Sequence, residues 1–110
     1  MPAKTERNYI VVIPTDTLPY VKRVNAGSPV GRTLAAVCGA PLEYRSIDRG
    51  LVLVTGEGQV ALNARATALA DLRGEVLRGD AVLLRLGKDD YTLYTKPAAQ
   101  AVAEILRCVM

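Results

Sequence analysis

Three short runs of β-favouring residues constrain the fold of this chain more than any other feature. They are Tyr9–Ile13 (YIVVI), Leu51–Thr55 (LVLVT) and Ala81–Leu86 (AVLLRL). Each run has the length of a strand and is followed by turn-forming residues. The continuous β-branched run YIVVI indicates a strand that is buried on both faces. A sheet with short, apolar strands is therefore expected.

Three further segments predict additional strands. Tyr20–Val24 is a short strand, and the adjacent Pro19 favours an edge position because proline cannot donate to a ladder. Leu42–Ile47 has alternating faces and is joined to the second run by the turn sequence Asp48-Arg49-Gly50, which predicts an antiparallel hairpin. Tyr91–Thr95 is strongly β-favouring and predicts a second hairpin with the third run.

Apolar residues at helical spacing predict about three helices, over 29–38, 63–73 and 98–109. Ser28 is expected to cap the first helix, with Pro29 as its first residue and Gly39 just beyond its end. Asn63 is expected to cap the second helix, and Pro97 to open the third.

These elements predict an α+β fold, with a mixed, mostly antiparallel sheet that is built from hairpins and packed with the helices. A chain of 110 residues has the size of one domain. We therefore expect residues 1–110 to form a single domain, with polar residues 1–7 frayed.

The absence of histidine limits the chemistry that the chain can perform. The usual general base near neutral pH is missing, and serine–histidine and cysteine–histidine machinery is excluded. Two isolated cysteines, Cys38 and Cys108, cannot make a structural zinc site. We expect both to be buried free thiols, with a disulfide between them left open. A non-enzymatic function is favoured, with no catalytic residue, no cofactor and no metal.

The N-terminal segment MPAKTERN lacks the apolar core of a signal peptide. Nor does any apolar run approach the roughly 20 residues that span a bilayer. We expect a soluble cytoplasmic protein that does not contact a membrane. The formal net charge of +3 permits an anionic partner but does not demand one.

The second apolar run leads into GEGQVA (residues 56–61), which matches the G-x-G-x-x-A pattern of dinucleotide-binding turns. That site needs a helix from the second glycine, yet the helical stripe begins cleanly only at Leu62. Moreover, Glu57 places a carboxylate where a pyrophosphate would sit. The rival interpretation is a hairpin turn leading to a short strand, Gln59–Ala61, with glycines supplying positive φ. The hairpin is favoured, and the nucleotide site stays open as an alternative.

The order of motifs from residue 9 to residue 86 carries a family resemblance. The motifs are YIVVI, then CGAPLE (38–43), LVLVTGEGQVALNARA (51–66) and GDAVLL (79–84). In this order they resemble a family of small uncharacterised domains of bacteriophages and mobile elements, known mainly as a domain of unknown function. The resemblance implies a phage or mobile-element context, and thus the host cytoplasm. It implies no known activity.

Five polar residues mark a candidate binding face. Arg45 and Arg49 belong to the first hairpin, Glu57 to the GEG turn, and Asn63 and Arg65 to the start of the middle helix. If these turns cluster at one end of the fold, they form a polar surface of the kind that often serves recognition. Ordinary turn polarity is the alternative.

From these residues and the family context we expect a non-enzymatic accessory protein that binds a host protein or a small ligand, as a monomer or homodimer. Interference with host defence is one instance, which rests on the family context alone. A weak nucleic-acid-binding regulatory domain is one alternative, and it predicts salt-dependent binding through Arg45, Arg49 or Arg65. A nucleotide-binding protein that uses GEGQVA is the other.

Overall fold

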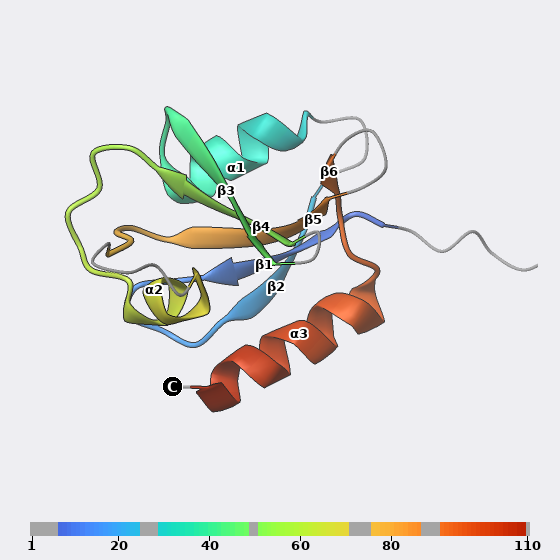
Figure 1. Ribbon diagram of the computed structural model, residues 1–110. Helices are drawn as coiled ribbons and strands as arrows, with labels where there is room; N and C mark the ends of the chain where they lie inside the picture. The colour runs from blue at the N-terminus through green and yellow to red at the C-terminus, as the bar shows by residue number, and fades with distance from the viewer. Residues whose placement is uncertain (1–6, 25–28, 49–50, 71–75, 87–90, 110) are drawn as a thin grey trace, which may run out of the picture.

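The computed structural model of the chain describes residues 7–24, 29–48, 51–70, 76–86 and 91–109 (Figure 1). Of the expected frayed segment, only Arg7 lies within these ranges. In chain order the elements are β1 (Tyr9–Ile13), β2 (Tyr20–Arg23), α1 (Val30–Cys38), β3 (Leu42–Asp48), β4 (Leu51–Gly56), α2 (Ala64–Ala70), β5 (Ala81–Leu86), β6 (Tyr91–Thr92) and α3 (Lys96–Val109).

The described strands form one antiparallel sheet in the order β2-β1-β5-β4-β3, and β6 pairs with β5 beside that path. β1 pairs with the first half of β5 and β6 with its last two residues, so both lie on the same side of β5. The expected hairpins β3–β4 and β5–β6 are present, and the edge position of β2 is confirmed. The fold is α+β, as predicted.

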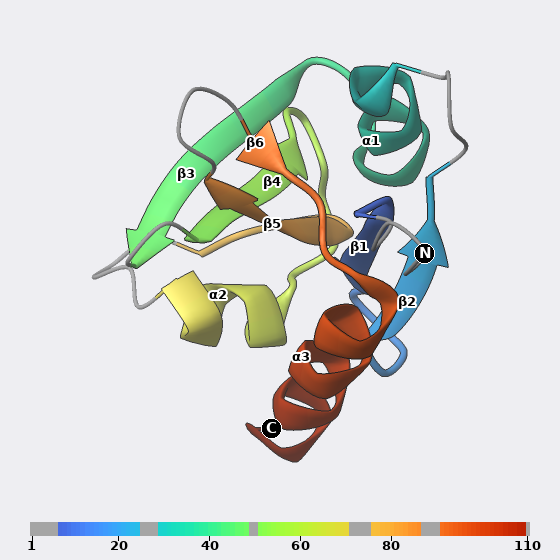
Figure 2. The same cartoon turned by 90° about the vertical axis from the view of Figure 1, so that its right-hand side faces the viewer.

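Strands β1, β4 and β5 are buried on both faces because alternate residues enter two separate cores. Val11, Leu53 and Leu83 lie in the core beneath α2 and α3. Val12 and Val52 lie in the core beneath α1. Figures 1 and 2 show α1 on one face of the sheet and the other two helices on the opposite face. The continuous apolar runs follow from this arrangement, since both faces of these strands are covered.

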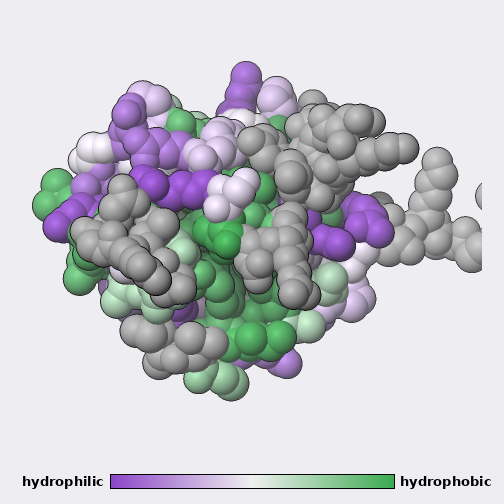
Figure 3. Space-filling view, viewed as in Figure 1, coloured by the Kyte–Doolittle hydropathy of each residue, from purple (hydrophilic) through white to green (hydrophobic). Residues whose placement is uncertain are grey.

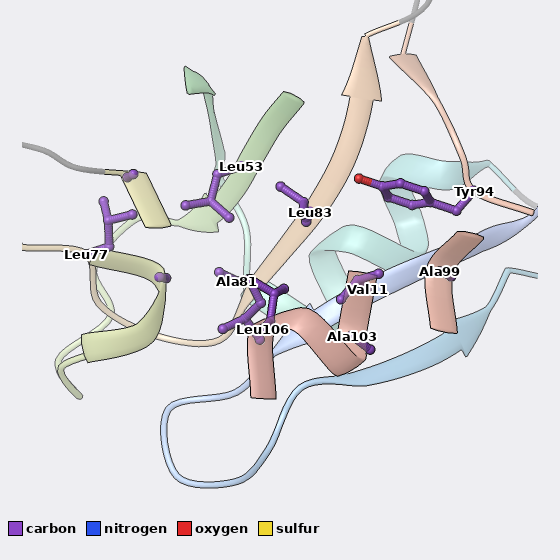
Figure 4. Close-up of a cluster of buried hydrophobic side chains, with 12 residues drawn as sticks. Val11, Leu53, Leu77, Ala81, Leu83, Tyr94, Ala99, Ala103 and Leu106 are labelled. Atoms are coloured by element: carbon purple, nitrogen blue, oxygen red, sulfur yellow. The ribbon is translucent and has the colours of Figure 1, made fainter. Parts of the chain in front are cut away.

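Helix α3 packs on the sheet through a stripe of small and aliphatic residues. Ala99, Ala103 and Leu106 are buried and lie in the same core as Val11 and Ala81 (Figure 4). The short side chains let the helix lie close to β1 and β2. Burial of a leucine of this kind contributes about 1.5–3 kcal/mol.

The start of α1 differs from the prediction. Pro29 precedes the helix in an extended conformation (φ −60°, ψ 131°), so the first helical residue is Val30. The expectation that Pro29 opens the helix is therefore wrong, because only a helical ψ would continue the chain into the first turn. Ser28, the expected cap, lies outside the described residues. Gly39 follows the helix with φ 88°, as expected for a residue beyond a C-terminus.

The other two helices have side-chain caps. Asn63 caps α2, as predicted; the predicted end of this helix, residues 71–73, lies outside the described residues. α3 begins at Lys96, earlier than the expected residue 98. The Thr95 hydroxyl accepts a backbone N–H of the first turn at 3.3 Å, which sets this earlier start. Pro97 is tolerated there because N–H groups of a first turn have no helical partner.

The segment after β4 corrects the hairpin interpretation of GEG. β4 continues through Gly56, residues 59–61 are not a strand, and Leu62 makes only an isolated bridge. A Cβ on Gly56 would lie 2.2 Å from the carbonyl oxygen of Cys38, so the end of α1 requires glycine here. Gly58 has φ 75° and turns the chain into a loop that leads to α2. Gly56 therefore permits the close approach of the end of α1, and Gly58 permits the turn into the loop.

Candidate functional site

A polar pocket with a volume of about 270 Å³ lies beside β3 and the end of β4. It is formed where three segments meet: β3, the β4 end with its following loop, and the segment before β5. We call it the β3–β4 pocket, and its lining residues are Glu43, Arg45, Thr55, Gly56, Glu57, Gly58, Gln59, Val76, Leu77 and Arg78.

Charges of both signs surround this pocket. Glu43 and Arg45 are two residues apart on β3 and therefore share a face, where Arg45 Nη2 lies 3.2 Å from Glu43 Oε2. Arg78 donates from Nη1 to the carbonyl oxygen of Val60 at 2.7 Å, which ties the third segment to the loop. Glu57 is exposed. Figure 3 shows hydrophilic side chains gathered over the upper part of the molecule, toward β3, and hydrophobic ones in the lower centre, toward α3.

The loop that bounds the pocket packs through Gln59 against two glycines, Gly39 and Gly79. A Cβ on Gly79 would lie 2.5 Å from Gln59 Cγ, and one on Gly39 would lie 2.7 Å from Gln59 Nε2. Both glycines also have positive φ, 82° and 88°. The Gln59 side chain thus packs over backbone that only glycine leaves open. This contact holds residues 57–59 near the end of α1 and the start of β5.

The Asn63 side chain connects the start of α2 to the end of β1 and to the segment before β5. Its side chain is 1% exposed, and Nδ2 donates to the carbonyl oxygens of Ile13 at 2.8 Å and Gly79 at 2.9 Å. Oδ1 accepts the backbone N–H of Ala66 at 2.9 Å. Burying an amide costs free energy unless it is hydrogen-bonded, and here both Nδ2 and Oδ1 form hydrogen bonds. Asn63 therefore supports the pocket region without presenting a polar group at the surface, in contrast to the expected binding role.

Two of the predicted site residues, Arg45 and Glu57, meet at the pocket. Arg65 does not line it, and its Nη1 lies 3.4 Å from the carbonyl oxygen of Thr17 in the loop between β1 and β2. Arg49 lies outside the described residues.

Sequence reasoning missed Glu43 and Arg78 as members of the site. Glu43 could have been found, because it stands two residues from Arg45 on a strand and so must share its face. Arg78 carries no such local signal, since it reaches the pocket through the turn before β5.

The two cysteines are free and differ in burial. Cys38 is 2% exposed, and its thiol donates to the carbonyl oxygen of Val54 at 3.6 Å. Burial, with a smaller contribution from the charge of Asp80, raises the pKa of Cys38 to about 12, so this thiol stays protonated at neutral pH. Cys108 is exposed, which corrects the prediction that both are buried. It stands two residues beyond buried Leu106, about 200° around the helix, and so faces away from the sheet.

Within the described ranges, no group of three or more His, Cys, Asp or Glu side chains could hold a metal ion. No helix there is long and apolar enough to cross a bilayer. A second cavity, about 490 Å³ in volume, lies between β2 and α3 and is lined by Tyr20, Val21, Gln100, Ala103, Glu104 and Arg107. It has one cationic and one anionic side chain, whereas the β3–β4 pocket has two of each.

The GEGQVA segment lacks the geometry of a dinucleotide-binding turn. That turn joins a strand of a parallel unit to a helix that begins at the second glycine. Here β4 is antiparallel to both of its neighbours, and α2 begins only at Ala64.

The chain matches no protein-family model, no curated protein and no solved structure. The site is therefore interpreted from its own residues and chemistry.

Proposed function

We propose that this chain is a non-enzymatic binding protein that takes a segment of a partner protein at the β3–β4 pocket. On its resemblance to phage and mobile-element domains, the partner is a host protein, and interference with host defence is one instance. The pocket itself, in which Glu43, Glu57, Arg45 and Arg78 come together, is the observation that carries the proposal.

The mixture of charges favours a peptide-like partner. Two guanidinium groups and two carboxylates offer donors and acceptors to a segment that carries both signs, as protein surfaces do. A nucleic acid presents phosphates, which the carboxylates of Glu43 and Glu57 would repel. The proposed partner therefore has acidic and basic side chains close together.

The size of the pocket agrees with the insertion of side chains from a protein partner. Sites for drug-sized ligands are typically about 300–1,000 Å³. The volume here, about 270 Å³, lies just below that range and suits one or two inserted side chains. A partner of this kind would gain further contact area from the surface around the pocket.

Affinity capture from host-cell lysate tests the proposal, with the chain as bait and quantitative mass spectrometry as the readout. Glu57→Lys reverses one charge in the pocket at an exposed position. Asp16→Lys makes the same change at an exposed position that does not line the pocket. We expect one protein to be retained by the wild type and Asp16→Lys and lost by Glu57→Lys. Equal recovery with all three baits would contradict a role for the pocket.

The nucleic-acid alternative is tested by fluorescence anisotropy with labelled DNA and RNA at low salt. The proposal predicts a flat titration. Salt-dependent binding that Arg45→Glu weakens would replace the protein-binding proposal with the alternative.

A further inference from the structure

The loop after β4 and the segment before β5 pair with each other at the margin of the β3–β4 pocket. The Asn63 N–H donates to the carbonyl oxygen of Leu77 at 2.9 Å, and Leu62 lies opposite Arg78 in an isolated antiparallel bridge. Side chains that stand opposite each other in an antiparallel pair point to the same side, and neighbours along one segment point to opposite sides. This pairing therefore gives the two segments an inner side and an outer side.

Burial shows which residues lie on each side. Asn63 is 1% exposed and Leu77 is 2% exposed, so both belong to the inner side. Leu62 is 52% exposed and Val76 is 51% exposed. Val76 stands two residues from Arg78 and so shares its side. The outer side therefore carries two large aliphatic side chains and one guanidinium.

Val60 extends this outer side. It is 81% exposed, and its carbonyl oxygen accepts a hydrogen bond from Arg78 Nη1 at 2.7 Å. We call the resulting surface the outer ladder face, and its members are Val60, Leu62, Val76 and Arg78. Exposed aliphatic side chains that occur singly need no explanation, whereas a group of them marks an interaction surface. Here three of them come from two paired segments.

Arg78 is the charged group of the outer ladder face, and its guanidinium has donors to spare. An arginine carries several N–H donors, and one hydrogen bond joins this guanidinium to Val60. Within the described part of the chain, no carboxylate forms an ion pair with Arg78. A carboxylate binds a guanidinium through two parallel hydrogen bonds, and aliphatic neighbours that exclude water strengthen such a pair. An anionic group is therefore the complement of this position.

The surroundings of Arg78 select a peptide as the source of that anionic group. Arg78 also lines the β3–β4 pocket, together with Glu43 and Glu57. These two carboxylates would repel the phosphates of a nucleic acid or of an anionic lipid surface. A peptide can direct an acidic side chain toward Arg78 and a basic one toward Glu57, and it can supply aliphatic side chains in addition.

We propose that the outer ladder face binds an acidic, apolar sequence within the partner segment: an aspartate or glutamate that pairs with Arg78, between large aliphatic side chains that pack on the three aliphatic residues of the face. The inference rests on the proposed function, because Val76 and Arg78 belong to both surfaces and make them continuous. It adds the sequence that the partner must carry.

Selection from a displayed library of random linear peptides tests the proposal, with the full chain as the target. The wild type is expected to enrich peptides in which an acidic residue lies between aliphatic ones. Arg78→Glu reverses the charge of the face, so it should enrich Lys or Arg at that position and keep the aliphatic neighbours. A misfolded variant cannot give this exchange of preference. A wild type that enriches no acidic, apolar peptide, or an Arg78→Glu variant that keeps the acidic preference, would overturn the proposal.

Truncation of an aliphatic side chain gives a second measurement. A labelled synthetic copy of the enriched peptide is titrated with each variant by fluorescence anisotropy. Leu62→Ser should raise the Kd about tenfold, because it removes an aliphatic contact from the face. Ile105→Ser is the matched change on α3, at a position that is 64% exposed and outside the face, and it should leave the Kd unchanged. Equal Kd values for Leu62→Ser and the wild type would refute the apolar contact.

Glu57→Lys separates this inference from the proposed function. If Leu62→Ser and Glu57→Lys both weaken binding of the peptide, the pocket and the outer ladder face act together, as proposed. Weakening by Glu57→Lys alone would retain the pocket and overturn the role of the face. Weakening by Leu62→Ser alone would retain the face and contradict the proposed role of the pocket.

Discussion

The two outer strands of the sheet, β2 and β3, differ in how far they are closed to further pairing. β2 has four residues, follows Pro19, and is packed by α3, whose Arg107 Nε donates to the carbonyl oxygen of Pro19 at 2.9 Å. Besides Tyr20, its exposed side chains are Lys22 and Arg23, which are both cationic. β3 has seven residues, and its Glu43 and Arg45 have opposite charges.

The difference shows that the two outer strands of one sheet can differ in the features that hinder edge-to-edge pairing. Short length, adjacent proline, like charges and a covering helix are all devices that hinder edge-to-edge pairing. β2 combines all of them. β3 also follows a proline, Pro41, and its register with β4 shifts between Ser46 and Asp48, but it is longer and its Glu43 and Arg45 have opposite charges. α3 packs against β2 on one face of the sheet, and the following experiments test how each outer strand depends on its neighbours.

The largest effect is expected from removing the packing of α3 on the β2 side. Leu106 is 4% exposed, so Leu106→Ala should lower the free energy of unfolding by about 2–5 kcal/mol in urea titrations. Ile105 is 64% exposed, and Ile105→Ala should cost no more than about 0.5 kcal/mol. Amide exchange should accelerate more on β2 than on β3 in the Leu106 variant. Equal losses for the two substitutions would mean that α3 does not hold this edge.

A smaller effect is expected on the β3 side, where the backbone at the end of β4 packs against the backbone at the end of α1. Gly56→Ala would push a methyl group against the carbonyl oxygens of Cys38 and Gly39, and should cost about 1–3 kcal/mol. Gly31→Ala is the matched change on α1, where nothing lies within 4 Å of the added carbon. It should stabilise the protein by about 0.5 kcal/mol through helix propensity. Thermal unfolding of both variants measures the difference, and a neutral Gly56→Ala would refute the close approach.

The smallest effect compares the two thiols, Cys38 near β4 and Cys108 on α3. The pKa of Cys38 is about 12 in the folded protein against an ordinary 9.0, so the unfolded chain loses this proton first as pH rises. Above pH 9 the unfolded state binds fewer protons, and stability should fall until about pH 12. At pH 10 the loss due to Cys38 is about 1 kcal/mol. Cys38→Ala should remove this part of the pH dependence, whereas Cys108→Ala should retain it; identical profiles for both variants would contradict the prediction.

The strands could be predicted well because their signals are local. Tyr9–Ile13 and Ala81–Leu86 are continuous apolar runs, and their burial on both faces gives those runs their composition. The turn residues between Leu42–Ile47 and Leu51–Thr55 predicted the pairing of these two strands, because a turn signal is also local. Helix starts were less accurate, since the backbone angle of Pro29 and the hydroxyl of Thr95 decide them by one or two residues.

The candidate site could be predicted only in part, because contacts between distant segments form it. Gly56 suggested a turn, but its role is set by the carbonyl oxygen of Cys38, which no local rule brings near. Asn63 was correctly expected to cap a helix, yet its bonds to Ile13 and Gly79 bury it. Arg45 and Glu57 meet only because β3 and β4 pair in their observed register.

The position of β1 between β2 and β5 has a consequence for the chain during its synthesis. Thr15, just beyond β1, contacts Asp80, just before β5, and these residues are 65 positions apart. At about 5–20 residues per second, ribosomes need roughly 3–13 s to make that interval. Until then the edge of β1 that pairs with β5 has no partner strand. A nascent chain stalled before residue 80 should therefore be the form of this protein most dependent on chaperones.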